Sequence, residues 1–340
     1  MKKNLPMLLL AAGLVVVLIV LIFVAAGIGN TDAQPTEIPT VTDAPTDAPT
    51  DAPTEAPTEA PTEAPTEAPT EAPTEAPTTP PVDQTGNASD RIGSLYTRGE
   101  LMAMDTTYNP DGYGAGKTSD GKRPGGPVSD QNKYGQYGGN FIAEDNNCVY
   151  LTFDCGYEYT ATDENGNRYR VTERILDVLK EKNVKAVFFV TMYYVKDQPD
   201  LIQRMIDEGH AVGNHTNNHP VMPAQSIDKM VYEVMSLHEY VQETFGYTMT
   251  LFRPPTGAFS VQSLSVLKSL GYKTMLWSFQ YYDYDTEDQM AVDKALERVT
   301  SYHHSGAIYL LHAISTSNAA LLGDAIDFFQ TQGYSVELFQ

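Results

Sequence analysis

The 340-residue chain has little cysteine and few basic residues, and each shortage excludes a class of protein. Its 22 Lys and Arg residues stand against 44 Asp and Glu residues, which gives a formal charge of −22. A nucleic-acid binder presents a basic patch, so we expect no binding to nucleic acid. Two cysteines cannot build a disulfide scaffold, and Cys148 and Cys155 are seven residues apart on one predicted strand. That spacing is roughly 23 Å, whereas a disulfide needs Cα atoms within about 7 Å, so both are expected to be free thiols unless one is a ligand.

Charged residues are absent from residues 7–28, an almost unbroken apolar run that follows Lys2 and Lys3. A bilayer span needs about 20 apolar residues, whereas the core of a cleaved signal peptide has about 7–15. We therefore expect residues 1–33 to be a cytoplasmic stub and a single transmembrane signal-anchor, with the rest of the chain outside the cell membrane. The alternative is a long signal peptide cleaved near Ala25–Ala33, which gives a secreted protein. No cysteine lies near the end of the run, so lipoprotein processing is not indicated.

Lys and Arg are also absent from residues 34–88, where Ala-Pro-Thr-Glu or Ala-Pro-Thr-Asp repeats every four residues. Frequent proline prevents helix and sheet, so this segment is predicted to be a disordered, extended linker that reaches on the order of 150 Å. We interpret it as a tether that lets the folded domain reach through a thick cell wall. The alternative is a spacer whose length has no such role. Residues 89–147 are irregular and rich in Gly and Tyr, and we expect an N-terminal wrap around the next domain, with a short helix near 92–104.

Short apolar runs alternate with helical patterns over the last domain, residues 148–340. Strands are predicted at 148–153, 184–191, 210–213, 249–253, 273–278, 306–311 and 334–338. Helices are predicted at 171–181, 201–208, 226–245, 261–270, 288–302 and 318–332, where apolar residues recur at helical spacing. About seven strands separated by helices imply an α/β fold with a parallel sheet, either open or closed as a barrel.

Polar residues follow the ends of several predicted strands. In such folds the carboxyl ends of the strands meet at one mouth, where an acid, a base and metal ligands can come together. The residues concerned are Asp154, His215, His219, Arg253, Asp283 and His312. Each has an ordinary explanation when taken alone: a turn aspartate, a chance His-x3-His spacing, a surface arginine or a core histidine. Their arrival at the same end of one sheet is what predicts a catalytic site.

The same segments, in order, resemble the five motifs of the polysaccharide deacetylases, the carbohydrate esterase family 4 enzymes that remove acetyl groups from N-acetylated sugars. The segments are Thr152–Gly156, His215–Pro220, Arg253–Gly257, Asp283-Tyr284 and Leu311-His312. Three of them, 153–158, 253–257 and 310–315, are similar to the delta-lactam-biosynthetic branch, whose enzymes deacetylate N-acetylmuramic acid on the way to the muramic delta-lactam of spore cortex. The resemblance covers about residues 130–340 and implies a distorted (β/α) barrel.

The resemblance also implies a role for each matching residue. Asp154 is the general base and Arg253 holds it ionised, while His312 is the general acid and Asp283 keeps that imidazole protonated. A divalent metal, Zn²⁺, Mn²⁺ or Mg²⁺, is bound by His215 and His219. Substrate contacts fall at Tyr157, Pro255, Thr256, Gly257, Tyr284 and Leu311. Backbone N–H groups around Thr256 and Gly257 are candidates for stabilising the oxyanion.

Three positions depart from the family pattern. Most members carry a second aspartate ligand where this chain has Cys155, and the delta-lactam branch commonly has asparagine there. Cys155 is either a thiolate ligand that suits zinc or a small residue at a lost ligand position. Tyr284 stands where the family usually has tryptophan, and Thr256 where many members have tyrosine, so both changes bear on substrate fit.

We expect a monomeric, membrane-anchored enzyme that removes the N-acetyl group of N-acetylmuramic acid in peptidoglycan glycan strands. Two alternatives remain from the sequence. The substrate is instead N-acetylglucosamine or another wall or capsule glycan, or the protein is an inactive wall-glycan binder. Cys155 gives the last alternative its support.

Overall fold

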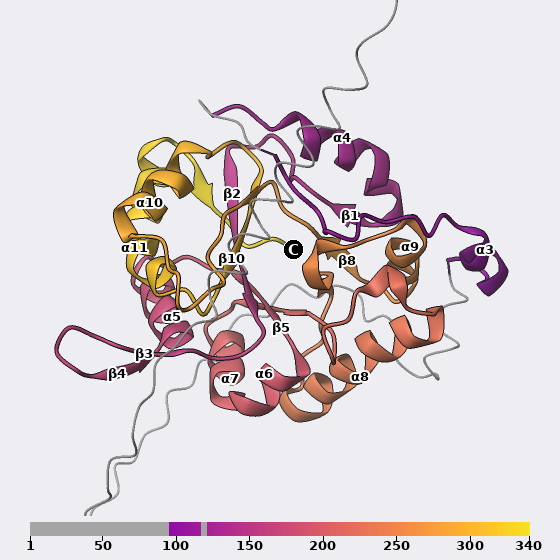
Figure 1. The fold of residues 1–340 in the computed structure, drawn as a ribbon, viewed down its shortest axis with the longest axis horizontal. Helices are drawn as coiled ribbons and strands as arrows, with labels where there is room; N and C mark the ends of the chain where they lie inside the picture. The colour runs from indigo at the N-terminus through magenta and orange to yellow at the C-terminus, as the bar shows by residue number, and fades with distance from the viewer. Residues whose placement is uncertain (1–94, 117–120) are drawn as a thin grey trace, which may run out of the picture. The chain divides into compact units, whose positions relative to one another are not determined.

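The computed structural model describes residues 95–116 and 121–340, and their fold is built on one parallel β-sheet (Figure 1). Neighbouring strands follow the order β1-β8-β7-β6-β5-β2-β10-β9, and β11 pairs with the start of β2. The strands are β1 Gly139–Asn140, β2 Cys148–Cys155, β5 Val187–Val190, β6 Ala211–Asn214, β7 Leu251–Phe252, β8 Lys273–Met275, β9 Phe279–Gln280, β10 Ala307–His312 and β11 Ser335–Val336. Because every pairing in this sheet is parallel, the carboxyl ends of its strands lie at one edge.

The sheet curves into a distorted, incomplete barrel. Strands β8 and β9 belong to one extended segment, 273–280, in which β8 pairs with β7 whereas β9 pairs with β10. The chain thereby crosses from one side of the curved sheet to the other. Within the described residues no ladder joins β9 to β1, so the barrel is not closed by strand pairing. The expected α/β fold with a distorted barrel of parallel strands is confirmed, as a barrel that is incomplete.

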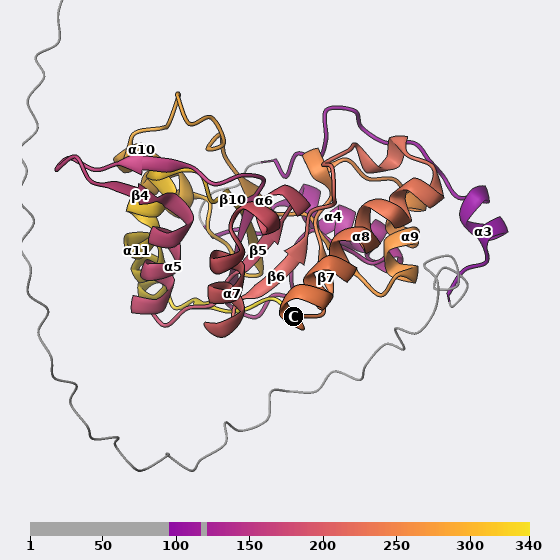
Figure 2. The ribbon, with the colours of Figure 1, turned by 90° about the horizontal axis from the view of Figure 1, so that it is seen from below.

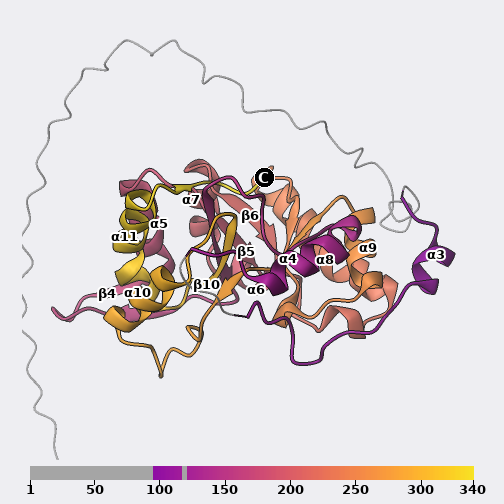
Figure 3. The same ribbon diagram turned by 90° about the horizontal axis from the view of Figure 1, so that it is seen from above.

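Helices cover the outside of the sheet at the places that the apolar periodicity predicts (Figure 1). They are α5 Val171–Glu181, α7 Pro199–Asp207, α8 Ile227–Phe245, α9 Val261–Ser269, α10 Val292–Ser301 and α11 Thr316–Thr331. Figure 3 shows α5, α10 and α11 gathered on one side of the sheet and α8 and α9 on the other. The side chains of Ser226 and Ser260 cap α8 and α9 by accepting backbone N–H groups, as their positions in the sequence predict.

Two hydrophobic clusters lie on the two faces of the sheet. The outer cluster joins the helices to strand residues such as Leu151, Phe153 and Leu311. The inner cluster fills the barrel with Phe189, Ile308, Leu310 and other strand residues. Because side chains of a strand alternate between faces, Thr152 and Asp154 of β2 point away from the outer cluster. This alternation decides which residue at a strand end can reach the mouth of the barrel.

Helix α3 (Arg98–Ala103) lies within the range expected for a short helix, but several other elements were not predicted. Helix α4 (Gly125–Tyr134) and strand β1 form where irregular chain was expected. Helix α6 (Met192–Asp197) directly follows β5. The antiparallel hairpin of β3 (Thr160–Thr162) and β4 (Arg168–Arg170) extends away from the sheet (Figure 2). Its turn contains Asn165-Gly166, a sequence that favours tight hairpins.

The predicted transmembrane segment and the proline-rich linker lie outside the described residues. In the part of the chain that is described, no helix has both the length and the apolar character needed to cross a bilayer. Cys148 and Cys155, both on β2, are free thiols, as their spacing predicts.

Candidate active site

Asp154 and Arg253 form a buried ion pair at the mouth of the barrel. Asp154 lies near the end of β2, and Arg253 directly follows β7. The Arg253 guanidinium donates from Nη1 to Asp154 Oδ1 at 2.8 Å and is itself fully buried. Its Nε donates to the carbonyl of Met275 and its Nη2 to that of Leu276, and its Cζ lies 4.2 Å from the centre of the Phe189 ring. The guanidinium is therefore held in one orientation.

The charge of Asp154 follows from this pairing. Burial raises the pKa of the Asp154 carboxyl, but the positive charge of the paired Arg253 lowers it and outweighs burial, and His215 and His312 act in the same direction. The pKa of Asp154 consequently lies below its ordinary value, and the group is a carboxylate at neutral pH. Its second oxygen, Oδ2, lies 3.6 Å from His215 Nε2.

His312 and Asp283 form the second pair, at the end of β10. Asp283 Oδ1 lies 2.7 Å from His312 Nδ1, and Oδ2 accepts the backbone N–H of His312 at 2.8 Å. The amide of Asn318 on α11 also donates to Asp283 Oδ2, at 2.7 Å. Burial lowers the pKa of His312, but the Asp283 carboxylate outweighs it and raises that pKa above its ordinary value. The contact through Nδ1 leaves Nε2 as the ring nitrogen that can act on a substrate.

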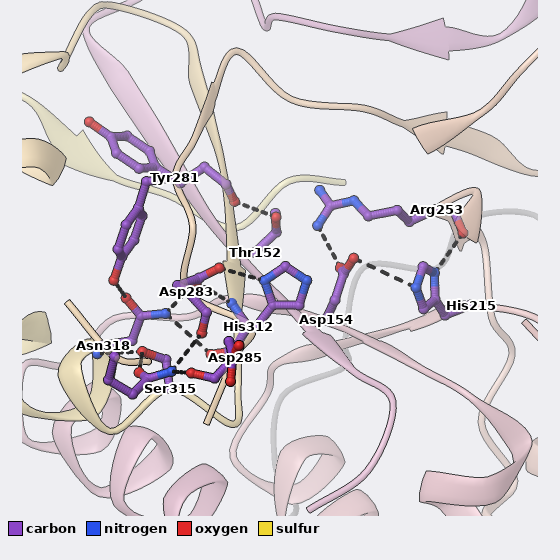
Figure 4. Close-up of polar contacts among 12 residues, drawn as sticks. Thr152, Asp154, His215, Arg253, Tyr281, Asp283, Asp285, His312, Ser315 and Asn318 are labelled. Atoms are coloured by element: carbon purple, nitrogen blue, oxygen red, sulfur yellow. Dashed lines mark hydrogen bonds and ion pairs between the residues drawn. The ribbon is translucent and has the colours of Figure 1, made fainter. Parts of the chain in front are cut away.

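The two pairs lie side by side. In the parallel ladder of β2 and β10, His312 is the register partner of Asp154. Figure 4 shows the His312 ring between Asp283 and the Asp154 carboxylate, with Arg253 and His215 on the far side of Asp154. The structure thus brings together Asp154, Arg253, Asp283 and His312, the catalytic residues expected from the sequence.

His215 and His219 lie on a strained loop after β6. Their rings are 4.9 Å apart, and His215 Nδ1 lies 2.8 Å from the carbonyl oxygen of Arg253. Thr216 and His219 both adopt positive φ angles, 74° and 56°, which cost energy outside glycine. Hydrogen bonds sustain the loop, because Asn214 accepts the N–H of Thr216 and Thr216 accepts the N–H of His219.

The histidine pair has the donor chemistry of a metal site. Burial lowers the pKa of His215 to about 4 and also lowers that of His219, so both imidazoles are neutral, the form that binds metals. With Nδ1 at the Arg253 carbonyl, His215 turns Nε2 toward Asp154 and the mouth. Over residues 95–116 and 121–340, however, no three His, Cys, Asp or Glu side chains are arranged to hold a metal. The residues fit a two-histidine partial site.

Cys155 lies apart from the two histidines, a position that favours the second of its two interpretations, a small residue where a ligand position was lost. It is fully buried in the outer hydrophobic cluster, on the opposite face of β2 from Asp154. Burial, together with the nearby Glu158 and Asp154 carboxylates, raises the pKa of the Cys155 thiol well above its ordinary value. A neutral thiol that faces the helices is a packing residue.

A cavity of about 1030 Å³ opens beside the catalytic pairs. Asp154, His215, His219 and His312 all line it. Of the predicted substrate contacts, Tyr157, Thr256, Gly257 and Tyr284 also line it. This volume lies at the upper end of the range for pockets that bind drug-sized ligands.

Two predicted substrate contacts, Leu311 and Pro255, do not line the cavity. Leu311 is buried in the outer cluster, and its neighbour Leu310 lines the cavity in its place, because alternate residues of β10 face opposite sides. Pro255 is buried, and its neighbour Pro254 lines the cavity instead.

The wall at Thr256 is strained. Thr256 has φ 58°, a rare value for a β-branched residue, inside the short turn Pro255–Gly257. The N–H of Gly257 donates to the Pro254 carbonyl at 3.0 Å, so it is engaged within the turn. The backbone N–H of Thr256 remains the candidate oxyanion donor in this segment.

Sequence reasoning missed several residues of the cavity. Trp277 closes the wall behind Gly257, and Tyr113 arrives from the N-terminal segment and packs on Trp277 with ring centres 5.5 Å apart. Asn318, which supports Asp283, was also missed. The Tyr113 and Asn318 contacts join distant parts of the chain, so no local pattern signals them. Trp277 could have been found, since it is the single tryptophan and ends a predicted strand.

Comparisons with known proteins agree with this geometry. A family model described as polysaccharide deacetylase matches residues 142–275. The peptidoglycan-N-acetylmuramic acid deacetylase PdaA of Bacillus subtilis is 43% identical over 188 residues, which make up 55% of this chain and 68% of PdaA. The chain belongs to the polysaccharide deacetylase family. The solved structure of B. subtilis PdaA, a family 4 carbohydrate esterase, matches with a TM-score of 0.61 and 35% identity over 68% of this chain and 95% of that chain.

A second relative is the peptidoglycan-N-acetylglucosamine deacetylase PgdA of Listeria monocytogenes, 33% identical over 192 residues, which cover 56% of this chain and 38% of PgdA. The polysaccharide deacetylase match ends at residue 275 and so includes Asp154, His215, His219 and Arg253. Asp283 and His312 lie beyond it. Their assignment therefore depends on the contacts between them and on the register that joins β10 to β2.

Proposed function

We propose that this polysaccharide deacetylase hydrolyses the N-acetyl amide of N-acetylmuramic acid in peptidoglycan and releases acetate. One observation carries the proposal: on adjacent parallel strands, the Asp154 carboxylate, paired with Arg253, and the His312 imidazole, whose pKa Asp283 raises, line the same cavity. The choice of sugar is supported by the 43% identity to PdaA, against 33% to the N-acetylglucosamine deacetylase PgdA.

Amide hydrolysis needs a base that activates water and an acid that protonates the departing nitrogen. Asp154 is the base, because Arg253 keeps it ionised although it is almost fully buried. Its Oδ2 accepts the proton of the attacking water, while Oδ1 stays engaged with Arg253.

His312 is the acid. Asp283 binds the proton on Nδ1 and stabilises the imidazolium, so Nε2–H is available to the sugar nitrogen as the C–N bond breaks. The Thr256 N–H is the donor we assign to the oxygen of the tetrahedral intermediate.

We propose that His215 and His219 bind a divalent cation, Zn²⁺, Mn²⁺ or Mg²⁺. When bound, such a cation polarises the acetyl carbonyl and lowers the pKa of water. The protein contributes two neutral imidazoles, and the Arg253 carbonyl fixes the orientation of the first. We further propose that the activity lies outside the cell membrane, where peptidoglycan is found and where the N-terminal sequence predicts the domain to be.

The test is incubation of the protein with peptidoglycan in the presence of Zn²⁺, Mn²⁺ or Mg²⁺, followed by mass spectrometry of the muropeptides and an acetate assay. We expect muramic acid residues that have lost one acetyl group, and no acetate from Asp154→Asn. Loss of the acetyl group from glucosamine residues alone would transfer the assignment to N-acetylglucosamine. No acetate from wild-type protein with any of the three metals would support a glycan binder without catalytic activity.

A further inference from the structure

Helix α8 carries a carboxylate, Glu233, that is fully buried, whereas the other buried side chains of this helix are apolar apart from His238. Burying a carboxylate is costly unless its oxygens are paired. The Asn218 backbone N–H donates to Glu233 Oε2 at 2.8 Å, and the Asn218 side-chain amide donates to Oε1 at 2.9 Å. Lys229 Nζ lies 2.8 Å from Oε1. Both Asn218 donors belong to the loop of residues 215–219, here called the histidine loop, which carries the two candidate metal ligands.

Glu233 binds two of the five backbone N–H groups of the histidine loop. The N–H of Asn217 donates to the Glu233 carbonyl at 2.9 Å, and that of Asn218 donates to its carboxylate. The other three donate to strand β5, to the side chain of Asn214 and to the hydroxyl of Thr216. Every backbone N–H of the loop therefore has a partner, and a buried N–H that loses its partner is costly.

The two amides that bind Glu233 lie between the two strained residues of the histidine loop. Thr216 and His219, with φ angles of 74° and 56°, flank Asn217 and Asn218. Such angles persist only where surrounding contacts enforce them. Asn217 and Asn218 also line the catalytic cavity, as the two histidines do. Loss of the Glu233 carboxylate lets the segment between the strained residues relax, which changes the separation and direction of the two imidazoles.

We propose that Glu233 is a positioning residue that holds the histidine loop in the conformation in which His215 and His219 bind one cation together. The proposal rests on the metal site of the proposed function. Glu233 acts through Asn218, the residue that directly precedes His219. Removing an outer partner that orients a metal ligand typically lowers metal affinity by about 10–100-fold. We therefore expect the metal affinity of the two histidines to depend on a carboxylate in a helix outside the sheet.

Calorimetric titration of the full-length protein with Zn²⁺ alone tests the proposal without turnover. Glu233→Ala removes both carboxylate contacts to Asn218, and we expect it to weaken Zn²⁺ binding by about tenfold. Glu233→Gln should stay within about threefold of wild type. Its amide oxygen accepts the Asn218 N–H, and its NH₂ group donates to the Asn218 side chain once that amide turns over.

Val241→Ala is the matched control for a general loss of stability. Val241 is also fully buried in α8, but its side chain packs in the outer hydrophobic cluster. We expect a lower melting temperature and unchanged Zn²⁺ affinity. Glu233→Asp serves if Glu233→Ala fails to fold, because it keeps the negative charge but is one methylene too short to keep both contacts. It should weaken Zn²⁺ binding in the same direction.

Hydrogen exchange of the metal-free proteins separates this proposal from the proposed function. We expect the amides of Asn217 and Asn218 to exchange about tenfold faster in Glu233→Ala than in wild type or Glu233→Gln. If wild-type protein bound no Zn²⁺, the proposed metal site would be lost, and faster exchange would still show that Glu233 holds the histidine loop. Wild-type Zn²⁺ affinity in a folded Glu233→Ala or Glu233→Asp protein, or unchanged amide exchange, overturns the proposal.

Discussion

The charge of each catalytic candidate depends mainly on one oppositely charged partner. Arg253 makes Asp154 a carboxylate, and Asp283 makes His312 a stronger base, although burial opposes both effects. These directions favour the protonation states that the proposed roles of Asp154 as the base and His312 as the acid require.

The pH dependence of kcat/KM tests the effect of Asp283 on His312. Because the pKa of His312 is raised, its protonated form persists above pH 6.5, and activity falls only as the pH rises through the folded-state pKa. Asp283→Asn removes the carboxylate that opposes burial. We expect the alkaline limb of the pH profile to move to lower pH by about one unit or more, with a lower maximum rate.

The stability of the fold should also decrease as the pH rises through the pKa of His312. The raised pKa means that the His312–Asp283 pair stabilises the fold below the unfolded-state pKa and loses this contribution as the pH rises through the folded-state value.

Asp285→Asn is the control for the pH profile, because the Asp285 carboxylate binds Tyr282 and not His312. A pH profile of Asp283→Asn that keeps the wild-type alkaline limb would contradict the assignment of His312 as the acid.

Cys155 provides a residue-level test of the metal site. Since its thiol faces the outer cluster, Cys155→Ala should leave Zn²⁺ affinity and turnover within about twofold of wild type and cost about 1 kcal/mol of stability. His219→Ala should lower Zn²⁺ affinity by about tenfold or more. Calorimetric metal titration and thermal unfolding give both quantities. If Cys155→Ala lost zinc as severely as His219→Ala, the thiol would have to be counted as a ligand.

At the level of elements, the alternation of a strand decides which of two neighbouring residues meets the substrate. Leu310 lines the cavity and Leu311 packs against the helices, although both belong to one motif. We expect Leu311→Ala to destabilise the protein by about 2–5 kcal/mol with a small change in KM. Leu310→Ala, its matched partner, should raise KM more than it lowers stability. Chemical denaturation and steady-state kinetics on the same two variants distinguish the roles, and the reverse pattern would refute the facing of β10.

The sequence allowed the helices and the order of the strand-end residues to be predicted, because both depend on local periodicity and on the geometry shared by parallel strands. The prediction for α5 matches its observed bounds of Val171–Glu181. Cys155 and Leu311 face the outer cluster and not the cavity, because the period of two along a strand, which a motif does not show, decides the face of each residue. The contacts of Tyr113 and Asn318 were unpredictable for another reason. Each joins segments far apart in the chain, and nothing in the local sequence specifies its partner.

At the level of the whole molecule, the N-terminal segment is part of the catalytic wall. Tyr113 packs on Phe141, Phe259 and Trp277, and Ala115 belongs to the inner cluster of the barrel. Gly112 lies so close to Thr256 that a Cβ at this position would come within 2.0 Å of the Thr256 carbonyl oxygen. Gly112 and its neighbours therefore pack directly against the strained turn at Thr256, which carries the proposed oxyanion donor. These residues lie more than a hundred positions earlier in the chain.

Shortened chains test this arrangement. A protein that begins at residue 95 keeps all of these contacts, and we expect its kcat/KM on a soluble octasaccharide to equal that of the full chain. A protein that begins at residue 121 loses Tyr113 and Ala115, so both its melting temperature and its kcat/KM should fall. Gly112→Ala separates folding from positioning, because it preserves the aromatic contacts but forces the segment away from Thr256 and requires a φ of 81° that favours glycine. We expect it to lower kcat by about tenfold with a smaller loss of stability, because displacing an oxyanion donor costs less than the roughly hundredfold or more that its removal costs. Unchanged kcat in Gly112→Ala would show that the turn at Thr256 keeps its shape without the N-terminal segment.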